Sequence, residues 1–124
     1  MPIRVHELGT LSPEKMAMAM AAADATVVSS RMENLPNMVA ESLACGTPVA
    51  AFAVGGIPEM VRSGVTGFLA SPHDPEELAE GICRLLERGG DMRDACASFA
   101  KETYAPETVA RRHLDLYRSL VETT

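Results

Sequence analysis

Tryptophan is absent from the sequence, and only two tyrosines and three phenylalanines occur among its 124 residues. So few aromatic rings leave little surface on which the bases of a nucleic acid could stack. Basic residues are also scarce, because 11 Lys and Arg face 17 Asp and Glu, which gives a formal net charge of −6. Nucleic-acid-binding domains are usually basic, so this balance argues against nucleic acid as a partner.

Long hydrophobic runs and regular cysteine patterns are missing as well. No apolar run reaches the roughly 18 residues that suggest a membrane-spanning helix, and residues 1–10 lack the apolar core of a signal peptide. The three cysteines, Cys45, Cys83 and Cys96, form no C-x-x-C pair. An odd number without a framework argues against a zinc site and favours reduced thiols, so a cytoplasmic location is expected.

Apolar runs alternate along the chain with turn residues and helix-start signals. Pro13 follows Ser12 and Pro75 follows Asp74, as at the starts of helices, while Gly46 suits the position just past a helix end. We expect strands over residues 3–8, 25–30, 47–54 and 67–70, and helices over residues 12–23, 36–46, 57–63 and 75–89. Such alternation with short connections predicts an α/β fold, in which helices flank both faces of a parallel sheet.

The spacing of apolar residues also predicts which side chains are buried. The expected buried stripe of the helix over residues 75–89 consists of Leu78, Ile82, Leu85 and Leu86. The methionines of "MAMAM" are interpreted as core filling rather than as a cofactor-binding surface. The tail over residues 91–124 is expected to be helical in two pieces, with a break at Pro106.

Ligands of parallel sheets bind beyond the carboxyl ends of the strands. This rule puts the candidate site in three loops, over residues 8–11, 29–37 and 54–58. In the third loop, Gly55 and Gly56 would let the backbone approach a ligand closely, although a tight turn alone would also require glycine. The sequence contains neither the G-x-G-x-x-G fingerprint of nicotinamide sites nor the phosphate loop of nucleoside triphosphatases.

The second loop leads into a helix that is predicted to begin near Pro36. The first turn of a helix has free backbone N–H groups and a positive dipole end, which together attract phosphate. Because proline lacks an N–H group, the expected donors are the backbone amides of Asn37 and Met38, together with that of Leu35. Arg31 is the only basic side chain near this helix start.

Two glutamates eight positions apart bracket this helix start. Glu41, about five residues into the helix, would face the cleft at a depth suited to the two hydroxyls of a ribose, which a carboxylate binds without titrating. Glu33, nearer the loop tip beside Asn34, could hold a hydroxyl of the group that the phosphate carries. The alternative is that Glu33 is a solvated loop residue and Glu41 an exposed helix residue.

Other reactive side chains carry weaker signals. His6 lies in "HELG", which lacks the second histidine of the H-E-x-x-H zinc motif. Cys45 has no evident partner histidine and is interpreted as a small buried residue rather than as a nucleophile. The serines at 29 and 30 lack the G-x-S-x-G nucleophile elbow.

The conjunction of these segments resembles a known family. The series "VHELG", "AAAD" before a strand, Glu33 and Glu41 in a Glu-x7-Glu motif, "ACGTPV", "GGIPE" and "GVTGFL" occurs in the order found in retaining glycosyltransferases of family 4. The resemblance covers roughly residues 4–88, and the tail is similar to the closing helices of that family. It implies the C-terminal, donor-binding half of a GT-B fold, with a partial Rossmann-like domain over residues 1–90 and a helical tail over residues 91–124 packed on it.

The resemblance assigns roles to the residues of the motif. Glu41 would hold the ribose of a nucleotide-diphosphate sugar, and Glu33 would be the catalytic glutamate that contacts the donor sugar. The remaining donor-binding set is Arg31, Asn34, Leu35, Asn37, Met38, Gly55 and Gly56. Many members have glycine at the position of Pro36, so one phosphate donor is lost here. No cofactor or metal is expected, because helix ends and bases neutralise the diphosphate.

Parts that the family has are not found in this sequence. An acceptor-binding N-terminal domain and a basic Arg/Lys pair that neutralises the diphosphate have no counterpart in residues 1–10, and electrostatic stabilisation is usually the largest catalytic term. One hypothesis is therefore a retaining sugar transferase, or a piece of one, acting on a hydroxyl of a polysaccharide or glycolipid. The other is a non-catalytic nucleotide-sugar-binding fragment or subunit, and the 124-residue chain alone is expected to be inactive.

The resemblance also implies partners beyond the donor. The acceptor glycan or glycolipid would bind through the absent N-terminal domain, at the inner membrane surface in the case of a longer parent enzyme. A sheet edge and apolar helix faces would be left uncovered, which predicts self-association or marginal stability.

Overall fold

The structure is built on a parallel sheet of three short strands in the order β1-β2-β3. The strands are β1 (Thr26–Val28), β2 (Val49–Phe52) and β3 (Gly67–Ala70). The computed structural model describes residues 2–123. Val27 pairs with Ala50, and Ala51 with Leu69, so the carboxyl ends of all three strands meet at one edge. The predicted parallel sheet is confirmed.

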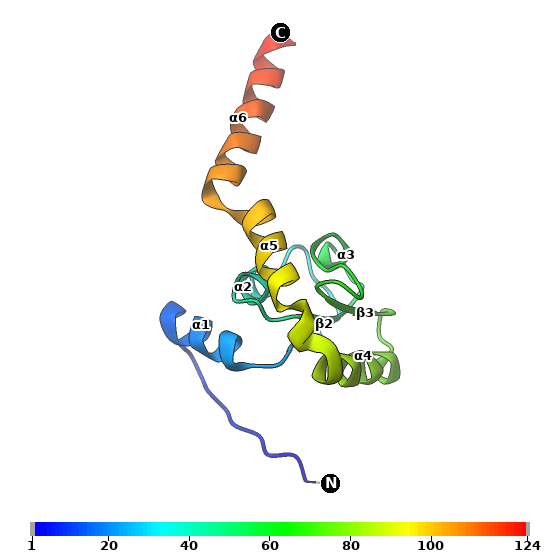
Figure 1. Ribbon diagram of the computed structural model, residues 1–124. Helices are drawn as coiled ribbons and strands as arrows, with labels where there is room; N and C mark the ends of the chain where they lie inside the picture. The colour runs from blue at the N-terminus through cyan, green and yellow to red at the C-terminus, as the bar shows by residue number, and fades with distance from the viewer. Residues whose placement is uncertain (1, 124) are drawn as a thin grey trace.

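The described residues also form six α-helices and one 3-10 turn, of which the last helix projects away from the sheet (Figure 1). They are α1 (Pro13–Ala22), α2 (Asn37–Ala44), α3 (Ile57–Met60), α4 (Pro75–Arg88), the turn η1 (Gly89–Met92), α5 (Arg93–Tyr104) and α6 (Pro106–Glu122). Every helix expected from the sequence is present, and α3 ends at Met60, a few residues earlier than expected. No described helix is long and apolar enough to cross a membrane.

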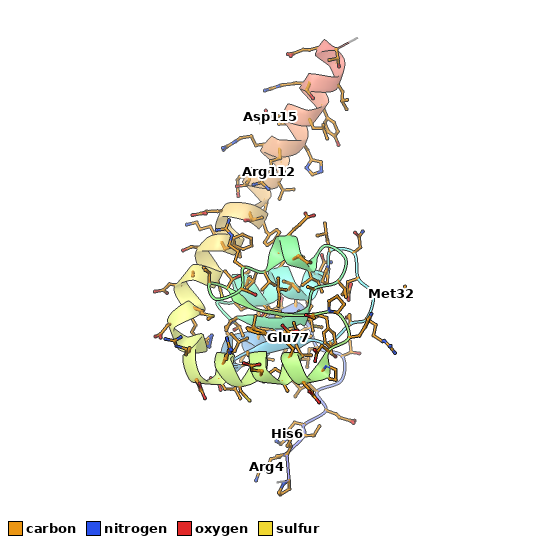
Figure 2. All side chains as sticks on the ribbon, turned by 90° about the vertical axis from the view of Figure 1, so that its right-hand side faces the viewer. Arg4, His6, Met32, Glu77, Arg112 and Asp115 are labelled. Atoms are coloured by element: carbon orange, nitrogen blue, oxygen red, sulfur yellow. The ribbon has the colours of Figure 1, made fainter. Side chains whose placement is uncertain are left out.

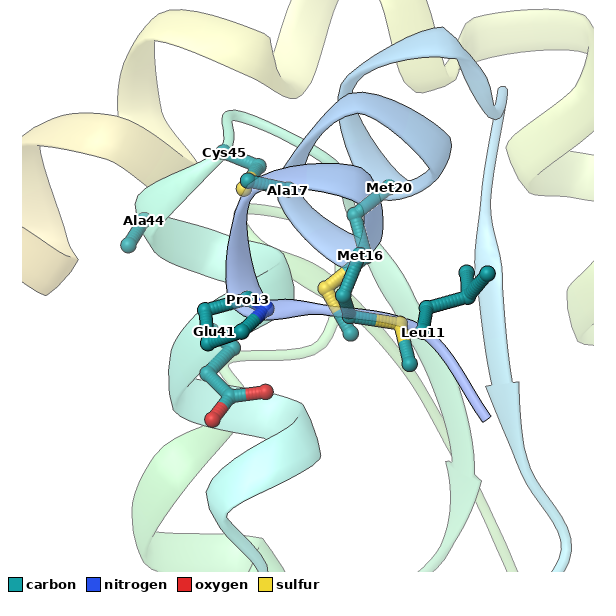
Figure 3. Close-up of a pocket in the computed structure, with 8 residues that line it drawn as sticks. All are labelled: Leu11, Pro13, Met16, Ala17, Met20, Glu41, Ala44 and Cys45. Atoms are coloured by element: carbon teal, nitrogen blue, oxygen red, sulfur yellow. The ribbon is translucent and has the colours of Figure 1, made fainter. Parts of the chain in front are cut away.

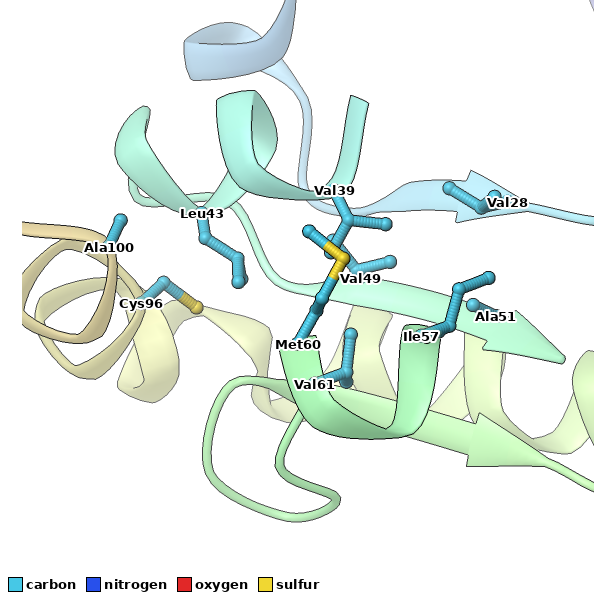
Figure 4. Close-up of a cluster of buried hydrophobic side chains, with 10 residues drawn as sticks. All are labelled: Val28, Val39, Leu43, Val49, Ala51, Ile57, Met60, Val61, Cys96 and Ala100. Carbon is cyan, nitrogen blue, oxygen red and sulfur yellow. The ribbon is translucent and has the colours of Figure 1, made fainter. Parts of the chain in front are cut away.

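The central strand β2 is buried on both faces, as its unbroken apolar sequence requires. Val49 and Ala51 point into a cluster with α2, α3 and α5, which Figure 4 shows in detail. Ala50 and Phe52 point the other way, into a second cluster with α4. Side chains alternate across a strand, so four consecutive apolar residues supply two cores.

Local signals in the sequence set the helix ends. The Ser12 side chain accepts a hydrogen bond from the backbone N–H of Lys15, and Asp74 accepts one from Glu77 at 3.0 Å. At the end of α2, Gly46 has φ of +75° and donates to the carbonyl of Leu43. This left-handed turn after the helix is the Schellman geometry that favours glycine.

The strand expected over residues 3–8 is wrong. These residues form an extended segment without strand pairing, and Ile3 and Val5 are 85% and 76% exposed. A strand needs a neighbour for its backbone hydrogen bonds, and no strand of the described residues lies beside this segment. In Figure 1 it runs away from the sheet toward the N-terminus.

Two expectations about buried helix faces need correction. Leu86, expected in the buried stripe of α4, is 61% exposed, whereas Leu78 and Leu85 are buried and Ile82 is half-buried. The tail divides at Pro106 as predicted, but only α5 packs on the sheet domain, through Cys96 and Ala100. The helix α6 has no buried residue and extends away from the body (Figure 2).

The loops after β1 and β2 are joined by their backbones. The N–H group of Gly56 donates to the carbonyl oxygen of Asn34 at 2.7 Å. Gly55 has φ of +55°, and a Cβ atom at this position would overlap the carbonyl oxygen of Glu33. The Gly-Gly sequence therefore serves a close backbone approach between two loops, which holds the Glu33 segment in place.

A matched pair of leucines tests the packing of α4. Leu85→Ala empties a buried site and is expected to lower the free energy of unfolding by about 2–5 kcal/mol. Leu86→Ala removes an exposed side chain and is expected to change it by less than about 0.5 kcal/mol. Urea titrations followed by circular dichroism measure both. Equal losses would mean that α4 is rotated relative to this structure.

Two glycines with similar backbone angles test the contact between the loops. Gly55→Ala adds a methyl group against the Glu33 carbonyl, whereas Gly64→Ala, with φ of +82°, adds one in open space. Both substitutions carry a left-handed backbone cost of about 1–2 kcal/mol. We expect Gly55→Ala to destabilise more, and to shift the amide NMR signals of residues 30–35, which Gly64→Ala leaves in place. Unchanged signals in both variants would contradict the contact.

Candidate functional site

Three helix starts and two joined loops lie near the carboxyl edge of the sheet, and only some of the helix starts are free. The start of α4 is occupied by its own side chains, because Asp74 accepts from Glu77 and the Glu77 carboxylate accepts from the N–H of Ser71 at 2.7 Å. The start of α2 has Pro36 as its cap residue and no side-chain cap. The first N–H groups of α2 therefore remain available to an anion.

The residues at the start of α2 are accessible. Asn37 and Met38 are the first two residues of the helix, and both are exposed. Leu35 is 56% exposed, and its side chain lies against Gly56, where a Cβ atom would contact it. Of the expected phosphate donors, the structure thus puts the amides of Asn37 and Met38 at an open helix start.

Glu33 is held in the loop that precedes this helix start. Its Oε1 atom accepts a hydrogen bond from Ser30 Oγ at 2.8 Å, and the residue is half-buried. Its carbonyl group faces Gly55. The neighbouring Arg31 is exposed. The Glu33 carboxylate is therefore oriented by a local contact and keeps oxygen lone pairs for a further partner.

Glu41 lies in a different part of the site, at a groove between α1 and α2. The groove has a volume of about 440 Å³. Its lining consists of Leu11, Pro13, Met16, Ala17, Met20, Glu41, Ala44 and Cys45. Glu41 is exposed, and Figure 3 shows it beside Pro13 with its carboxylate directed away from Met16 and Met20. An apolar trough with one carboxylate at its rim suits a flat, partly polar group that offers hydroxyls.

From the sequence, Glu41 was expected to face a cleft, but the α1 side chains that form the opposite wall of the groove were not expected there. The methionines of α1 were interpreted as core filling, and Met20 is buried, yet Met16 and Met20 also line the groove and Met18 is 71% exposed. Leu11 belongs to the first of the three expected loops and does reach the site. A spacing of four residues between Met16 and Met20, which puts both on one helix face, was the available signal.

The predicted site residues thus form two groups along α2. The loop group comprises Glu33, Asn34, Leu35, Gly55 and Gly56, joined by the contacts between the two loops, together with Arg31, which lies in the first of these loops. Glu41 is the fifth residue of α2, about 6 Å further along the helix axis than its first residue. The open start of α2, with Asn37 and Met38, lies between the two groups.

Outside this site, the buried thiol of Cys96 and any clustered metal ligands are the candidates for reactivity. Cys96 lies in the core, where burial raises the pKa of its thiol to about 11, against a smaller lowering by the positive charge of Arg93. Such a thiol is protonated near neutral pH and is a poor nucleophile. Within residues 2–123, no group of three or more His, Cys, Asp or Glu side chains could hold a metal ion.

Sequence relatives are sugar transferases much longer than this chain. It is 40% identical over 111 residues to D-inositol 3-phosphate glycosyltransferase from Nocardioides sp., which covers 87% of this chain and 24% of the relative. The corresponding protein of Mycobacterium tuberculosis is 38% identical over 123 residues, which covers 95% of this chain and 25% of the relative. The chain thus spans about a quarter of the length of these curated relatives.

Solved structures give the same picture. Sucrose-phosphate synthase from Thermosynechococcus elongatus superposes with a TM-score of 0.83 at 32% identity, over 94% of this chain and 30% of that one. HepE from Anabaena, solved with UDP, gives a TM-score of 0.74 at 28% identity, over 82% and 29%. HepE has also been solved with UDP-glucose, with a TM-score of 0.72 at 28% identity, over 84% and 30%.

The fold of these neighbours is GT-B, as the resemblance implied. The family profile of the glycosyl transferases group 1 matches residues 2–103, which include both glutamates of the motif and the two joined loops. Because this match extends over most of the chain, the chain belongs to the family of glycosyl transferases group 1.

Proposed function

We propose that this chain forms the donor site of a glycosyltransferase, which binds a nucleotide-diphosphate sugar. The observation that carries the proposal is the uncapped start of α2, between the Glu33 loop and the groove that holds Glu41. A diphosphate at the helix start would have its nucleoside on the groove side and its sugar on the Glu33 side. Binding of UDP and UDP-glucose by HepE supports a donor of this class.

In this arrangement the chain's own groups neutralise the diphosphate. The amides of Asn37 and Met38 donate to phosphate oxygens, the α2 dipole adds a positive field, and Arg31 in the preceding loop supplies a positive charge. The proposal needs no bound metal for this step. Glu41 accepts hydrogen bonds from the ribose hydroxyls while the apolar groove covers the face of the nucleoside.

Transfer with retention is the finer part of the proposal. The bond between the sugar C1 atom and the phosphate oxygen breaks, and a bond from C1 to the acceptor oxygen forms on the same face. The acceptor proton passes to the departing phosphate oxygen, so atoms balance without a protein nucleophile. Glu33 is the catalytic residue in this scheme, because its oriented carboxylate would contact the donor sugar.

The acceptor would be a hydroxyl of a polysaccharide or glycolipid, and the site would be cytoplasmic, at the inner membrane surface in a longer protein. Three free thiols suit a reducing compartment. The curated relatives are named for D-inositol 3-phosphate, so a small polyol phosphate is a second acceptor class to assay.

The second candidate function is nucleotide-sugar binding without transfer. Binding alone would need only the open start of α2 and the groove beside Glu41.

Two glutamates on neighbouring helices test the ribose assignment. Glu41→Ala removes the carboxylate of the groove and is expected to weaken nucleotide binding by about tenfold or more, since hydrogen bonds to charged groups are the strong ones. Glu59→Ala removes an exposed carboxylate of α3 and is expected to leave affinity unchanged. Ligand-observed NMR with UDP-, GDP- and ADP-sugars measures affinity and identifies the base.

Three outcomes would count against the donor site. Equal losses of nucleotide affinity in Glu41→Ala and Glu59→Ala would mean that Glu41 does not bind the ribose. Binding that survives in a folded double variant, Glu33→Ala with Glu41→Ala, would put the nucleotide elsewhere. A folded parent chain that binds none of the three nucleotide sugars would overturn the donor site as a property of this chain.

We also propose that the chain self-associates. Among residues 2–123, no strand pairs with the outer edge of β1, where Val27 is 42% exposed, and α6 exposes Leu114, Leu116, Tyr117 and Leu120. Exposed strand edges and apolar faces favour association. Sedimentation velocity over a concentration series is expected to show a rising mean mass. A single monomer species at all concentrations would contradict this proposal.

A further inference from the structure

The helix α1 forms one wall of the groove but has little core of its own. Of its residues, only Met20 is buried. Its packing partner is α2, across the groove itself. At the end of α1 the N–H group of Ala23 donates to the carbonyl oxygens of Ala19 and Met20, and the carbonyl groups after these find partners elsewhere in the chain. What holds the C-terminal end of α1 therefore determines where this wall stands.

Those partners come from Arg93, which begins α5 about 70 positions further along the sequence. Its Nη2 atom donates to the carbonyl oxygens of Ala21 at 2.8 Å and Ala23 at 3.2 Å. Its Nη1 atom donates to the carbonyl oxygen of Gly46 at 3.0 Å and contacts the Thr47 hydroxyl at 3.3 Å. One guanidinium thus joins the end of α1 to the turn that ends α2.

A second contact runs parallel to this one. The buried Thr47 hydroxyl donates to the carbonyl oxygen of Met20 at 2.6 Å. Thr47 itself is fixed by its N–H bond to Ser42 in α2. The end of α1 is therefore attached to α2 by Thr47 and Arg93 together, and charge-assisted bonds such as those of Arg93 are the stronger kind.

We propose that Arg93 is a positioning residue that sets the α1 wall of the groove, and through it the affinity for the nucleoside. Arg93 does not line the groove, so it acts through the segments that it joins, the end of α1 and the turn after α2. Hydrogen exchange of α1 distinguishes the first of these from the second. The effect on the nucleoside rests on the proposed donor function, whereas the effect on α1 does not.

The three cysteines of the chain offer a direct test of the position of α1. Cys45 lines the groove opposite Ala17 (Figure 3) and is half-buried. Cys83 is exposed on α4 and reports the reactivity of an open thiol, and Cys96 is fully buried in the core. If α1 moves away, Cys45 alone gains access to a reagent.

The experiment is pulsed alkylation with iodoacetamide at about pH 8, read by peptide mass spectrometry, on the parent chain and on Arg93→Ala, Arg93→Lys and Arg88→Ala. Arg88 is an exposed arginine of α4 outside the groove and serves as the matched control. Hydrogen exchange of residues 13–23 is measured on the same samples.

For Arg93→Ala we expect alkylation of Cys45 to rise by about tenfold, the effect of losing one strong hydrogen bond, and α1 amides to exchange faster. Cys83 should react as in the parent and Cys96 should stay protected. The lysine variant, which keeps the charge but not the fork of donors, should lie between the two, and Arg88→Ala should match the parent. If Arg93→Ala does not fold, the comparison of Arg93→Lys with the parent chain still tests the proposal.

Two results would overturn the proposal. In one, Cys45 and α1 are as protected in the variants as in the parent. In the other, Cys45 and Cys96 become reactive together, which would make Arg93 a general stability residue.

Measuring UDP-sugar affinity on the same variants distinguishes a failure of this proposal from a failure of the proposed donor function. Arg93→Ala is expected to weaken UDP-sugar binding by about tenfold at a temperature where Cys96 stays protected. Unchanged affinity in a variant whose Cys45 is exposed would overturn the link from α1 to the nucleoside. If the parent chain itself binds no nucleotide, the donor function fails, while the alkylation result still decides whether Arg93 positions α1.

Discussion

The structure depends on the burial of β2 on both faces. Its four residues are all inaccessible or nearly so, and both of its edges are paired. This arrangement requires helices on each side of the sheet, and right-handed parallel connections then bring every strand to the same edge with its carboxyl end. The two loops that contain Glu33 and Gly55 meet at that edge because the strands before them, β1 and β2, are neighbours. The burial of β2 (Val49–Phe52) thus determines at which edge of the sheet the site lies.

Much of the fold could be predicted because its signals are local. Helix starts at Ser12 and Asp74, the Schellman turn at Gly46 and the apolar runs of the strands each depend on a few neighbouring residues. The strand expected over residues 3–8 failed for the complementary reason. Its alternation of apolar residues is real, but a strand requires a partner in space, which the pattern of one segment cannot supply.

The site shows the same division between local and distant information. Glu33 and Glu41 were singled out by their spacing around a helix start and assigned roles by the family resemblance, and these roles stay predictions. Gly55 and Gly56 were expected to allow a close approach of the backbone to a ligand or a tight turn, and the structure shows a close approach between two loops. The groove wall formed by Met16 and Met20 was missed, because an apolar helix face has the same sequence pattern whether it meets a core or lines a groove. Only the position of α1 relative to α2 distinguishes the two.

That position depends on contacts between residues far apart in sequence. The Glu33 loop is held by backbone contacts to the next loop, whereas the groove beside Glu41 is held by Thr47 and Arg93. A ligand that reached from the Glu33 side to the groove would need both supports to keep their spacing. Because α5 contributes Arg93 to one support and buries Cys96 in the core, this first tail helix is part of the site's scaffold. The exposed α6 contributes to neither support.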